Sequence, residues 1–363
     1  MQIRSYNICL VIGSLGMGGA ERSIAELANF LVLHNHSVAI ITLIKRDHFF
    51  ELNSKIRLIE PSFYSLDSTS NKIVLGLKTI FYLRKAITTL NPDVIYSVAF
   101  PTLFLISTIG LKYPIVISIR CNPLNHKLID PFPLFVKRIV FRRATGIIAQ
   151  TEFAASQIKK MTNHSNIAVI PNFLREIEDV KVEKKKYIIN VGRFIKEKGH
   201  KYLLEAFSLI PSNGWKLLFV GDGRLRESLV NFAENLNISD RVIFLGEKNN
   251  VDYYLRQSEI FVFSSISEGF PNALLEAMAI PLPCISFDCD SGPSEIIHDS
   301  VDGFLVKPKD VVTLAAKMAQ LMNNEELRDK FMKNAIKVRE NFQMDKIANK
   351  YFQFLIANID TVK

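Results

Sequence analysis

The sequence lacks the signatures by which several common kinds of site are recognised. It has four cysteines in 363 residues, and no two of them form a Cys-x-x-Cys pair. It contains no His-Glu-x-x-His motif, and its seven histidines are scattered. Disulfide frameworks and metal sites built on Cys or His are therefore unsupported, and we expect reduced, buried thiols and no bound metal.

Two phosphate-binding motifs are also missing. The first glycines of the chain, at positions 13, 16, 18 and 19, do not fit the G-x-G-x-x-G pattern. No G-x-x-x-x-G-K-[ST] segment occurs anywhere. The dinucleotide fingerprint and the P-loop are thus excluded as sources of nucleotide binding.

No secretion signal or membrane span is expected. Residues 1–12 lack a basic start, an apolar core and a small-residue cleavage site in that order. One uncharged stretch covers the eighteen residues 94–111, but Pro101 and several hydroxyl side chains interrupt it. A strand followed by a helix that begins at Pro101 explains this stretch better, and we expect a cytoplasmic chain.

Apolar runs of strand length alternate with helical segments along most of the chain. Strands are predicted at 7–12, 38–43, 94–98, 115–119, 146–149, 167–170, 187–191, 216–220, 242–245, 260–263 and 284–287. Such alternation is typical of parallel sheets covered by helices on both faces. The length and a charged, aperiodic run after Pro171 predict two Rossmann-like domains, 1–172 and 187–343, joined by a linker at 173–186. The ligand crevice is expected between the two domains.

Positive charge is concentrated in the first half of the chain. Residues 1–180 contain 20 Lys and Arg against 12 Asp and Glu, whereas residues 181–363 contain 25 against 24. This asymmetry indicates that the first half meets an anionic partner, which is a nucleic acid, a phosphorylated substrate or an acidic lipid surface.

A Gly-Gly turn, Gly18-Gly19, leads into the first predicted helix at Ala20-Glu21. Glycine lets a ligand approach the backbone closely, and the start of a helix favours anions. The same pattern also fits an ordinary tight turn between a strand and a helix.

The second half places two cations directly after a predicted strand. Residues 192–199 (GRFIKEKG) put Arg193 and Lys198 at the carboxyl end of that strand, where open α/β sheets bind ligands. Arg supplies paired donors and Lys a point charge, so together they suit a diphosphate. The alternative is a solvated basic loop, because Lys196 and Lys201 are also nearby.

Two carboxylates flank the start of the helix predicted within residues 267–278 (SEGFPNALLEAM). Pro271 suits the first turn, Glu268 precedes it, and Glu276 lies about 7.5 Å beyond Pro271 along the axis. The free N–H groups of a helix start favour a phosphate. Because carboxylates do not bind phosphates, both acids are expected to accept hydrogen bonds from hydroxyls on either side of it. A sugar nucleotide has hydroxyls on both sides of its phosphates and fits this pattern. The alternative, an amphipathic helix with an ordinary cap, would not explain the paired acids.

Taken together, these elements resemble the retaining glycosyltransferases of the GT4 type, which have a GT-B fold of two Rossmann-like domains facing each other across a cleft. The two glutamates match the family's E-x7-E element. Further matches occur, in order, at Gly18-Gly19-Ala20-Glu21, Gly192-Arg193, Lys198-Gly199, Gly221-Asp222-Gly223 and 292–297 (GPSEII). The resemblance covers nearly the whole chain, and residues 287–297 look most like bacterial enzymes of lipid-linked oligosaccharide, O-antigen or capsule synthesis.

The resemblance implies which residues contact the donor. Arg193 and Lys198 would hold its diphosphate. Glu268 would accept hydrogen bonds from the hydroxyls of the donor sugar, with the amides of Gly269 and Phe270 close to that sugar. No covalent nucleophile is assigned, and these cations are expected to neutralise the leaving diphosphate without a divalent metal.

The resemblance extends to the ribose, the acceptor and the end of the chain. Glu276 would bind the ribose, and Gly18 and Gly19 would lie against the diphosphate or the acceptor. A helix within 344–363 would return to the first domain. Where many relatives have a histidine, this sequence has Arg120 in an Arg-x-Asn-Pro arrangement, so Arg120 either orients donor or acceptor or forms a structural ion pair.

A basic and apolar segment in the first half predicts a lipid-facing surface. The cations of this segment are Lys127, Lys137, Arg138, Arg142 and Arg143. A helix over 134–143 would rest on anionic lipid at the inner face of the membrane and receive a pyrophosphate-linked acceptor, with Lys78, Arg84 and Lys85 adding to the surface. Core aromatics beside a solvated face are the alternative.

The sequence therefore predicts a retaining glycosyltransferase that moves a sugar from UDP-hexose or UDP-N-acetylhexosamine to a glycan or a polyprenyl-diphosphate-linked oligosaccharide. A sugar-nucleotide epimerase of the same fold is one alternative. A nucleic-acid-binding protein, suggested by the pI near 9.2, is another, although no RRM, KH or zinc-finger pattern is present and we expect no nucleic acid as a partner.

Overall fold

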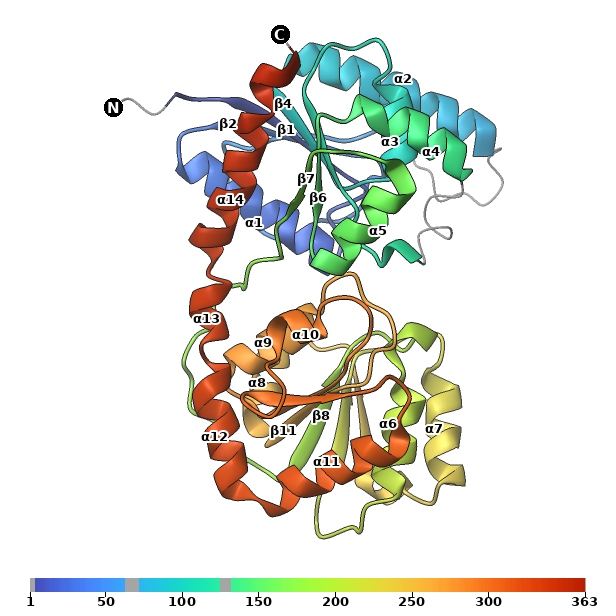
Figure 1. Ribbon diagram of the computed structural model, residues 1–363, viewed down its shortest axis with the longest axis vertical. Helices are drawn as coiled ribbons and strands as arrows, with labels where there is room; N and C mark the ends of the chain where they lie inside the picture. The colour runs from blue at the N-terminus through green and yellow to red at the C-terminus, as the bar shows by residue number, and fades with distance from the viewer. Residues whose placement is uncertain (1–3, 63–71, 125–131, 363) are drawn as a thin grey trace. The chain divides into compact units, whose positions relative to one another are not determined.

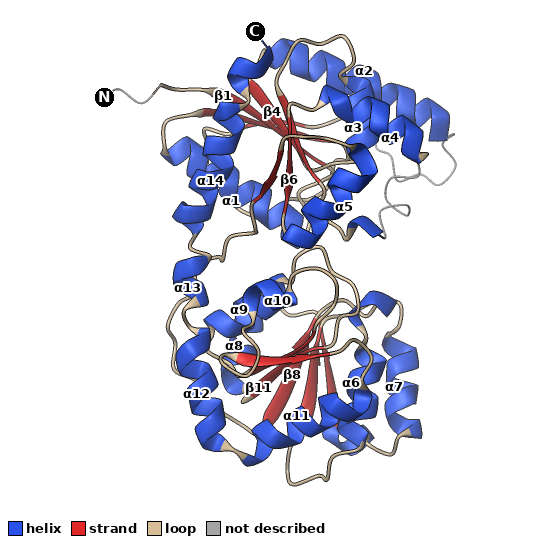
Figure 2. Cartoon of the chain, viewed as in Figure 1, coloured by secondary structure: helices blue, strands red, loops and turns tan. Residues whose placement is uncertain are grey.

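The computed structural model describes residues 4–62, 72–124 and 132–362, and the chain forms two compact units (Figures 1 and 2). Unit 1 comprises Met1–Phe173 together with Asp345–Lys363, and unit 2 comprises Leu174–Met344. Each unit is a parallel sheet with helices packed against it, so both are doubly wound α/β folds.

Unit 1 is built on a seven-stranded sheet in the order β3-β2-β1-β4-β5-β6-β7. Its strands are β1 (Asn7–Ile12), β2 (Ser37–Thr42), β3 (Arg57–Ile59), β4 (Val94–Ser97), β5 (Ile115–Ser118), β6 (Gly146–Ala149) and β7 (Ile167–Val169). Its helices are α1 (Gly19–Leu33), α2 (Lys72–Leu90), α3 (Pro101–Ser107), α4 (Leu134–Val140), α5 (Glu152–Thr162) and α14 (Met344–Ala357), with short 3-10 helices η2 (Phe141–Arg143) and η5 (Ile359–Val362). The central strands are buried on both faces, which is why their sequences read as continuous apolar runs.

Unit 2 is built on a six-stranded sheet in the order β10-β9-β8-β11-β12-β13. Its strands are β8 (Tyr187–Val191), β9 (Lys216–Val220), β10 (Val242–Gly246), β11 (Ile260–Phe263), β12 (Cys284–Phe287) and β13 (Gly303–Val306). Its α-helices are α6 (His200–Ser208), α7 (Arg226–Asn235), α8 (Val251–Gln257), α9 (Asn272–Ala279), α10 (Pro293–Ile296), α11 (Val311–Asn323), α12 (Glu325–Ala335) and α13 (Val338–Asn341). Two 3-10 helices, η3 (Lys196–Lys198) and η4 (Ser239–Arg241), complete it.

In both units the strands are all parallel, but at one point of the sheet the chain stops adding strands on one side and continues on the other. In unit 1 this point falls between β1 and β4, and in unit 2 between β8 and β11. Loops that leave the carboxyl ends of two such strands diverge to opposite faces and open a crevice, which is where α/β sheets bind ligands. The loops after β8 and β11 therefore mark the candidate site of unit 2.

The last α-helix, α14, packs on unit 1. The hydroxyl of Tyr351 donates a hydrogen bond to the backbone oxygen of Ile170 at 3.2 Å. A Cβ atom built on Gly146 would lie 2.8 Å from the ring of Phe354, so the absence of a side chain at this strand position lets the helix approach the sheet. This contact joins the end of the chain to β6 and to the segment after β7.

The predicted strands are confirmed to within one or two residues at their ends. The uncharged stretch 94–111 is the strand β4 followed by α3, which begins at Pro101 as predicted. Within the described ranges, no helix is long and apolar enough to cross a bilayer. The short edge strand β3 was not predicted, because its three residues are too few to show a period.

A buried histidine, His200, begins α6 in the core of unit 2. It is 2% exposed and lies edge-on to the rings of Phe194 and Phe219. Neither ring nitrogen has a hydrogen-bond partner among the described residues. Burial, and then the nearby charge of Lys198, lower the pKa of His200 from 6.5 to about 3. The imidazole is therefore neutral in the folded protein at any pH above that value.

This depressed pKa predicts an acid-sensitive contribution to stability. Above pH 6.5 the imidazole is neutral in both the folded and the unfolded state. Below pH 6.5 it binds a proton in the unfolded chain but stays neutral in the folded protein. The free energy of unfolding therefore falls as the pH drops. The loss should reach about 2 kcal/mol between pH 7 and pH 5. In His200→Leu the free energy of unfolding, measured with urea at pH 7 and at pH 5, should differ less between the two pH values by that amount. An unchanged difference would contradict the prediction.

Candidate functional site

Three loops meet at the carboxyl edge of the sheet in unit 2. The loop after β8 is tied to the loop after β9 by a hydrogen bond from the amide of Phe194 to the oxygen of Asp222 at 2.8 Å. It is tied to the loop after β11 by the hydroxyl of Ser264, which donates to the oxygen of Lys198 at 3.0 Å, and by the amide of Ile266, which donates to the oxygen of Glu197 at 2.8 Å. These bonds fix the backbone that carries the predicted diphosphate cations.

Two glycines make this close contact possible. Gly199 has a φ of +63°, and a Cβ atom there would lie 2.1 Å from the backbone oxygen of Ser264. Gly221 has a φ of +135°, and a Cβ atom there would lie 2.1 Å from the backbone oxygen of Gly192. No L-residue fits either position without moving backbone atoms. The glycines noted in the sequence thus serve the packing of the loops against one another.

The first predicted acid, Glu268, is paired with the predicted cation Lys198. The ammonium nitrogen of Lys198 lies 2.6 Å from Oε1 of Glu268, and both side chains are partly buried. The same ammonium lies 5.4 Å from the ring centre of Phe263, at the end of β11. A charge-assisted hydrogen bond of this length holds both side chains in one orientation. The structure thus brings together two residues that are 70 positions apart in the sequence.

The second predicted acid, Glu276, lies on α9 and is paired with a residue that the sequence did not single out. Nε of Arg175 lies 3.6 Å from Oε1 of Glu276. The other end of the same guanidinium forms two hydrogen bonds with the carboxylate of Asp252 on α8, one of them at 2.9 Å. Arg175 lies at the start of the charged run that is interpreted as a linker. The composition of this run gives no sign that Arg175 pairs with acids of two helices.

The electrostatics of Arg175 show that these acids outweigh its burial. Burial opposes the charge of the guanidinium, but the hydrogen bonds and charges of Asp252 and Glu276 raise the pKa of Arg175 above its ordinary value. The side chains of Arg175 and Glu276 are both about four-fifths buried. Charges in such a setting are screened less than those at the surface.

The start of α9 lies between the two acids. The helix begins at Asn272, and Pro271, which was expected in the first turn, is its N-cap residue with no side-chain cap. The backbone oxygen of Gly269 accepts a hydrogen bond from the hydroxyl of Ser291 at 2.9 Å. The ring of Phe270 is buried beside Phe342, so only its backbone can face a ligand.

Arg193 differs from the other cation of its loop. Its side chain is exposed, and no ion pair involving it occurs among the described residues. Lys198 is therefore held in place by an acid, whereas Arg193 extends from the loop into solvent. The roles of these residues toward a ligand stay predictions.

In unit 1 the predicted residues also lie at the carboxyl edge of the sheet. Gly18 is the N-cap residue of α1, and a Cβ atom there would lie 2.2 Å from Oε2 of Glu21, so the carboxylate of Glu21 covers the glycine. The amide of Arg22 donates to the oxygen of Gly18 at 3.0 Å, and Gly19 is the exposed first residue of the helix.

Arg120 follows β5 and organises a polar cluster in unit 1. Nη1 donates to Oδ1 of Asn172 at 2.5 Å and Nη2 donates to the hydroxyl of Tyr96 at 2.9 Å. The guanidinium also lies 5.7 Å from the ring centre of Tyr351 on α14. Burial opposes its charge, but Tyr351 and Tyr96 raise the pKa of Arg120 above its ordinary value. Among the described residues Arg120 has no carboxylate within ion-pair distance. The structural ion pair that was one alternative is therefore not formed, and the partners of Arg120 are neutral side chains.

The predicted lipid-facing surface requires a correction. The structure places Leu134–Val140 in α4, and a 3-10 helix follows at Phe141–Arg143. Lys137 is only 4% exposed, and Arg143 donates to the backbone oxygens of Leu111 and Tyr113 at 2.6 and 2.9 Å. These two cations therefore face the protein.

The remaining cations of that surface divide differently. Arg138 and Arg142 are exposed, as are Lys78 and Lys85 on α2. Arg84 donates to the backbone oxygens of Ser107 and Ile109 at 3.0 and 2.8 Å. Lys127 lies outside the described residues.

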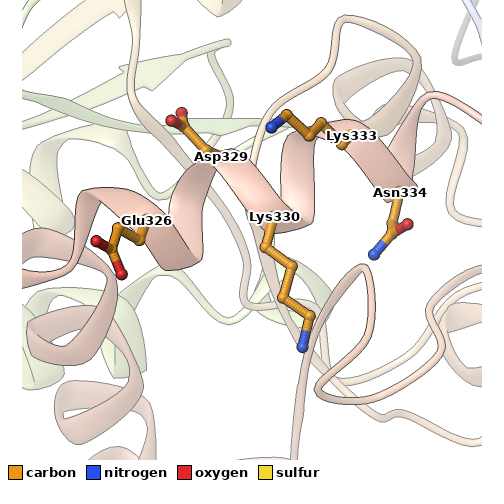
Figure 3. A pocket seen from close by; sticks show the side chains of 5 residues that line it. All are labelled: Glu326, Asp329, Lys330, Lys333 and Asn334. Carbon is orange, nitrogen blue, oxygen red and sulfur yellow. The ribbon is translucent and has the colours of Figure 1, made fainter.

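A shallow hollow of about 390 Å³ lies along α12, and none of the predicted site residues lines it (Figure 3). It is lined by Glu326, Asp329, Lys330, Lys333 and Asn334. Its charges are of both signs, and Asn334 is engaged with the backbone oxygen of Val301. We assign no chemistry to it. No cluster of three or more potential metal-binding side chains occurs in the part of the chain that the structure describes.

Comparison with known families matches both halves of the chain. Residues 174–338 match the model of the glycosyl transferases group 1, and residues 17–175 match that of Glycosyltransferase Family 4. These ranges correspond closely to the two units.

Two curated relatives and one solved structure are similar over nearly their whole length. The α-1,4-N-acetyl-D-galactosaminyltransferase of Campylobacter jejuni, named for GalNAc-alpha-(1->4)-GalNAc-alpha-(1->3)-diNAcBac-PP-undecaprenol, is 28% identical over 97% of this chain and 98% of its own. An amylovoran biosynthesis glycosyltransferase of Erwinia amylovora is 24% identical over 96% and 99%. The structure of HepE from Anabaena in complex with UDP superposes with a TM-score of 0.75 at 16% identity, over 97% of this chain and 100% of that one.

The partners of Arg120 predict a mainly structural role. Arg120→Met should lower the free energy of unfolding by about 1–2 kcal/mol, because Oδ1 of Asn172 and the hydroxyl of Tyr96 each lose one hydrogen-bond donor, although Gln150 still donates to Asn172. The matched control is Arg138→Met on the exposed face of α4, which should change stability by no more than about 0.5 kcal/mol. Chemical unfolding of both variants measures the difference, and equal effects would contradict it.

Proposed function

This chain belongs to the GT4-type glycosyltransferases with a GT-B fold, and we propose that it moves a sugar, with retention, from a UDP-sugar to a glycan or a polyprenyl-diphosphate-linked acceptor. The observation that carries the proposal is the pair of acids around the start of α9, each held by a cation: Glu268 by Lys198 and Glu276 by Arg175. The helix start between them is suited to a phosphate, and the acids are suited to hydroxyls on either side of it.

The leaving group of the reaction is a nucleoside diphosphate, and its growing charge has to be balanced. In the proposed mechanism Arg193 and Lys198 bind the diphosphate and the start of α9 adds its partial positive charge. Glu268 orients the donor sugar through its hydroxyls, while the departing phosphate accepts the proton of the acceptor. These groups supply the positive charge that a divalent metal provides in other transferases, so the mechanism includes no metal.

Two similarities support the choice of substrates. HepE, which shares the fold, was solved with UDP, and the Campylobacter relative is named for an acceptor on PP-undecaprenol. The Erwinia relative is named for amylovoran biosynthesis. We therefore assign this chain to the synthesis of a bacterial surface polysaccharide, with UDP-hexose or UDP-N-acetylhexosamine as donor.

The proposed donor site predicts loss of turnover in two variants. Lys198→Ala and Glu276→Ala should each lower kcat/KM for the UDP-sugar by about 100-fold, because one removes charge from the diphosphate and the other a partner of the ribose. The assay is UDP release from a panel of UDP-sugars with membrane lipid extract as acceptor, and release by the unmodified chain should persist in EDTA. Lys196→Ala, on the same loop, is the matched control; near-normal activity of both site variants would refute the site.

We further propose that unit 1 docks on an anionic membrane at the inner face. Figure 1 shows α2, α3 and α4 together on one side of the unit, and α3 packs against both neighbours. Among the described side chains of α2 and α4, the exposed large apolar ones are Val74, Leu77, Phe81, Leu134, Phe135 and Ile139. Neither helix contains an acidic residue. Exposed apolar groups beside exposed cations are typical of helices that lie in a membrane interface.

This surface predicts salt-sensitive binding to lipid vesicles. The protein should sediment with anionic vesicles at low salt and be released at high salt. Lys78→Gln and Arg138→Gln should each weaken binding about fivefold, which corresponds to about 1 kcal/mol per cation. Phe81→Ser tests the apolar part; Val312→Ser, an equally exposed apolar residue of unit 2, is its control. Absence of sedimentation at low salt would overturn the proposal.

A further inference from the structure

Arg175 connects two helices of unit 2 through one guanidinium. Its terminal nitrogens bind the carboxylate of Asp252 in a two-point arrangement, and its Nη1 also donates to the backbone oxygen of Glu176 at 3.2 Å. Nε of the same guanidinium lies 3.6 Å from Oε1 of Glu276. The guanidinium is thus held by Asp252 on α8 and by the backbone oxygen of Glu176, while its Nε lies next to the acid on α9.

In this arrangement Asp252 holds Arg175 in place next to Glu276, and Arg175 does not take up Glu276 in a two-point pair of its own. A two-point Arg–carboxylate pair is geometrically demanding, and here Asp252 takes it. The distance from Nε of the same cation to Oε1 of Glu276 is longer, at 3.6 Å. The carboxylate of Glu276 is therefore oriented and kept next to positive charge. An acid prepared in this way is suited to accept hydrogen bonds from two adjacent hydroxyls.

We propose that Arg175 is a positioning residue, which orients Glu276 for the ribose of the donor nucleotide; the inference rests on the donor site proposed above. Arg175 does not touch the nucleotide in this role. It acts through the carboxylate of Glu276, and Asp252 in turn holds the guanidinium. The segment that joins the two units thereby contributes to nucleotide affinity, although its sequence shows no binding motif.

The test compares two ligands by calorimetry: UDP, which has a ribose, and inorganic pyrophosphate, which does not. Arg175→Met should raise the Kd for UDP about tenfold and leave that for pyrophosphate unchanged. Glu276→Ala should have a similar effect on UDP, and the double variant should be no weaker than Glu276→Ala alone, because the two residues act on one interaction. Asp252→Asn should weaken UDP binding by a smaller factor.

A matched control separates positioning from folding. Arg339 is a partly buried arginine of the same unit that pairs with Asp179 at 2.7 Å and donates to the oxygen of Ala279, at the other end of α9. Arg339→Met removes another two-point ion pair, in this case with the exposed acid Asp179, and should leave the Kd for UDP unchanged. Thermal unfolding of each variant shows whether it is folded at the temperature of the measurement.

The outcomes distinguish this inference from the proposed function. If the unmodified chain does not bind UDP, or if Glu276→Ala binds it normally, the donor site itself is wrong. If Glu276→Ala weakens UDP binding and Arg175→Met does not, only the positioning role is overturned. Equal loss of UDP and pyrophosphate binding in Arg175→Met would also overturn it, since a general distortion of the unit would act on both.

Discussion

The candidate site depends on the pairing of acids and cations at one edge of a parallel sheet. Two carboxylates next to a phosphate-binding helix start would repel the ligand unless each had a positive partner. Lys198 supplies that partner for Glu268 at 2.6 Å, and Arg175 supplies it for Glu276 at 3.6 Å. Because both pairs are partly buried, they orient the acids more strongly than surface pairs could. The acids can then serve hydroxyls while the surrounding charge stays suited to a diphosphate.

Much of the fold could be predicted from the sequence because the core strands are buried on both faces. The run Ile8–Ile12 of β1 and the whole of β11 are apolar, so the positions of these strands are visible without any partner strand. The spacing of Glu268 and Glu276 across a Pro-containing turn was equally visible, and family membership now favours the transferase over the epimerase. Of the two cations that pair with these acids, only Lys198 could be predicted, because it follows a strand. Arg175 could not, because it lies in a charged run without apolar periodicity.

The errors at the basic surface have a different cause. A seven-residue helix such as α4 has two turns, and its sequence does not reveal which turn faces the protein. Lys137 is buried although the next residue, Arg138, is exposed, and the change to a 3-10 helix at Phe141 directs Arg143 toward the backbone of the loop after α3. Side-chain direction at the end of a short helix is set by tertiary packing, which composition cannot report.

The pairing of Lys198 with Glu268 also constrains how a donor would enter the site. An ammonium group has three N–H donors, and one of them is engaged with Oε1 of Glu268. In the proposed donor complex, a diphosphate could therefore bind to Lys198 without breaking that pair, and Glu268 would stay available for the sugar attached to the same diphosphate. Arg193, exposed on the same loop, has no such acid among the described residues and can follow the leaving group. In the proposed mechanism, the paired cation Lys198 orients the substrate, and the exposed cation Arg193 stabilises the charge that develops as the bond breaks.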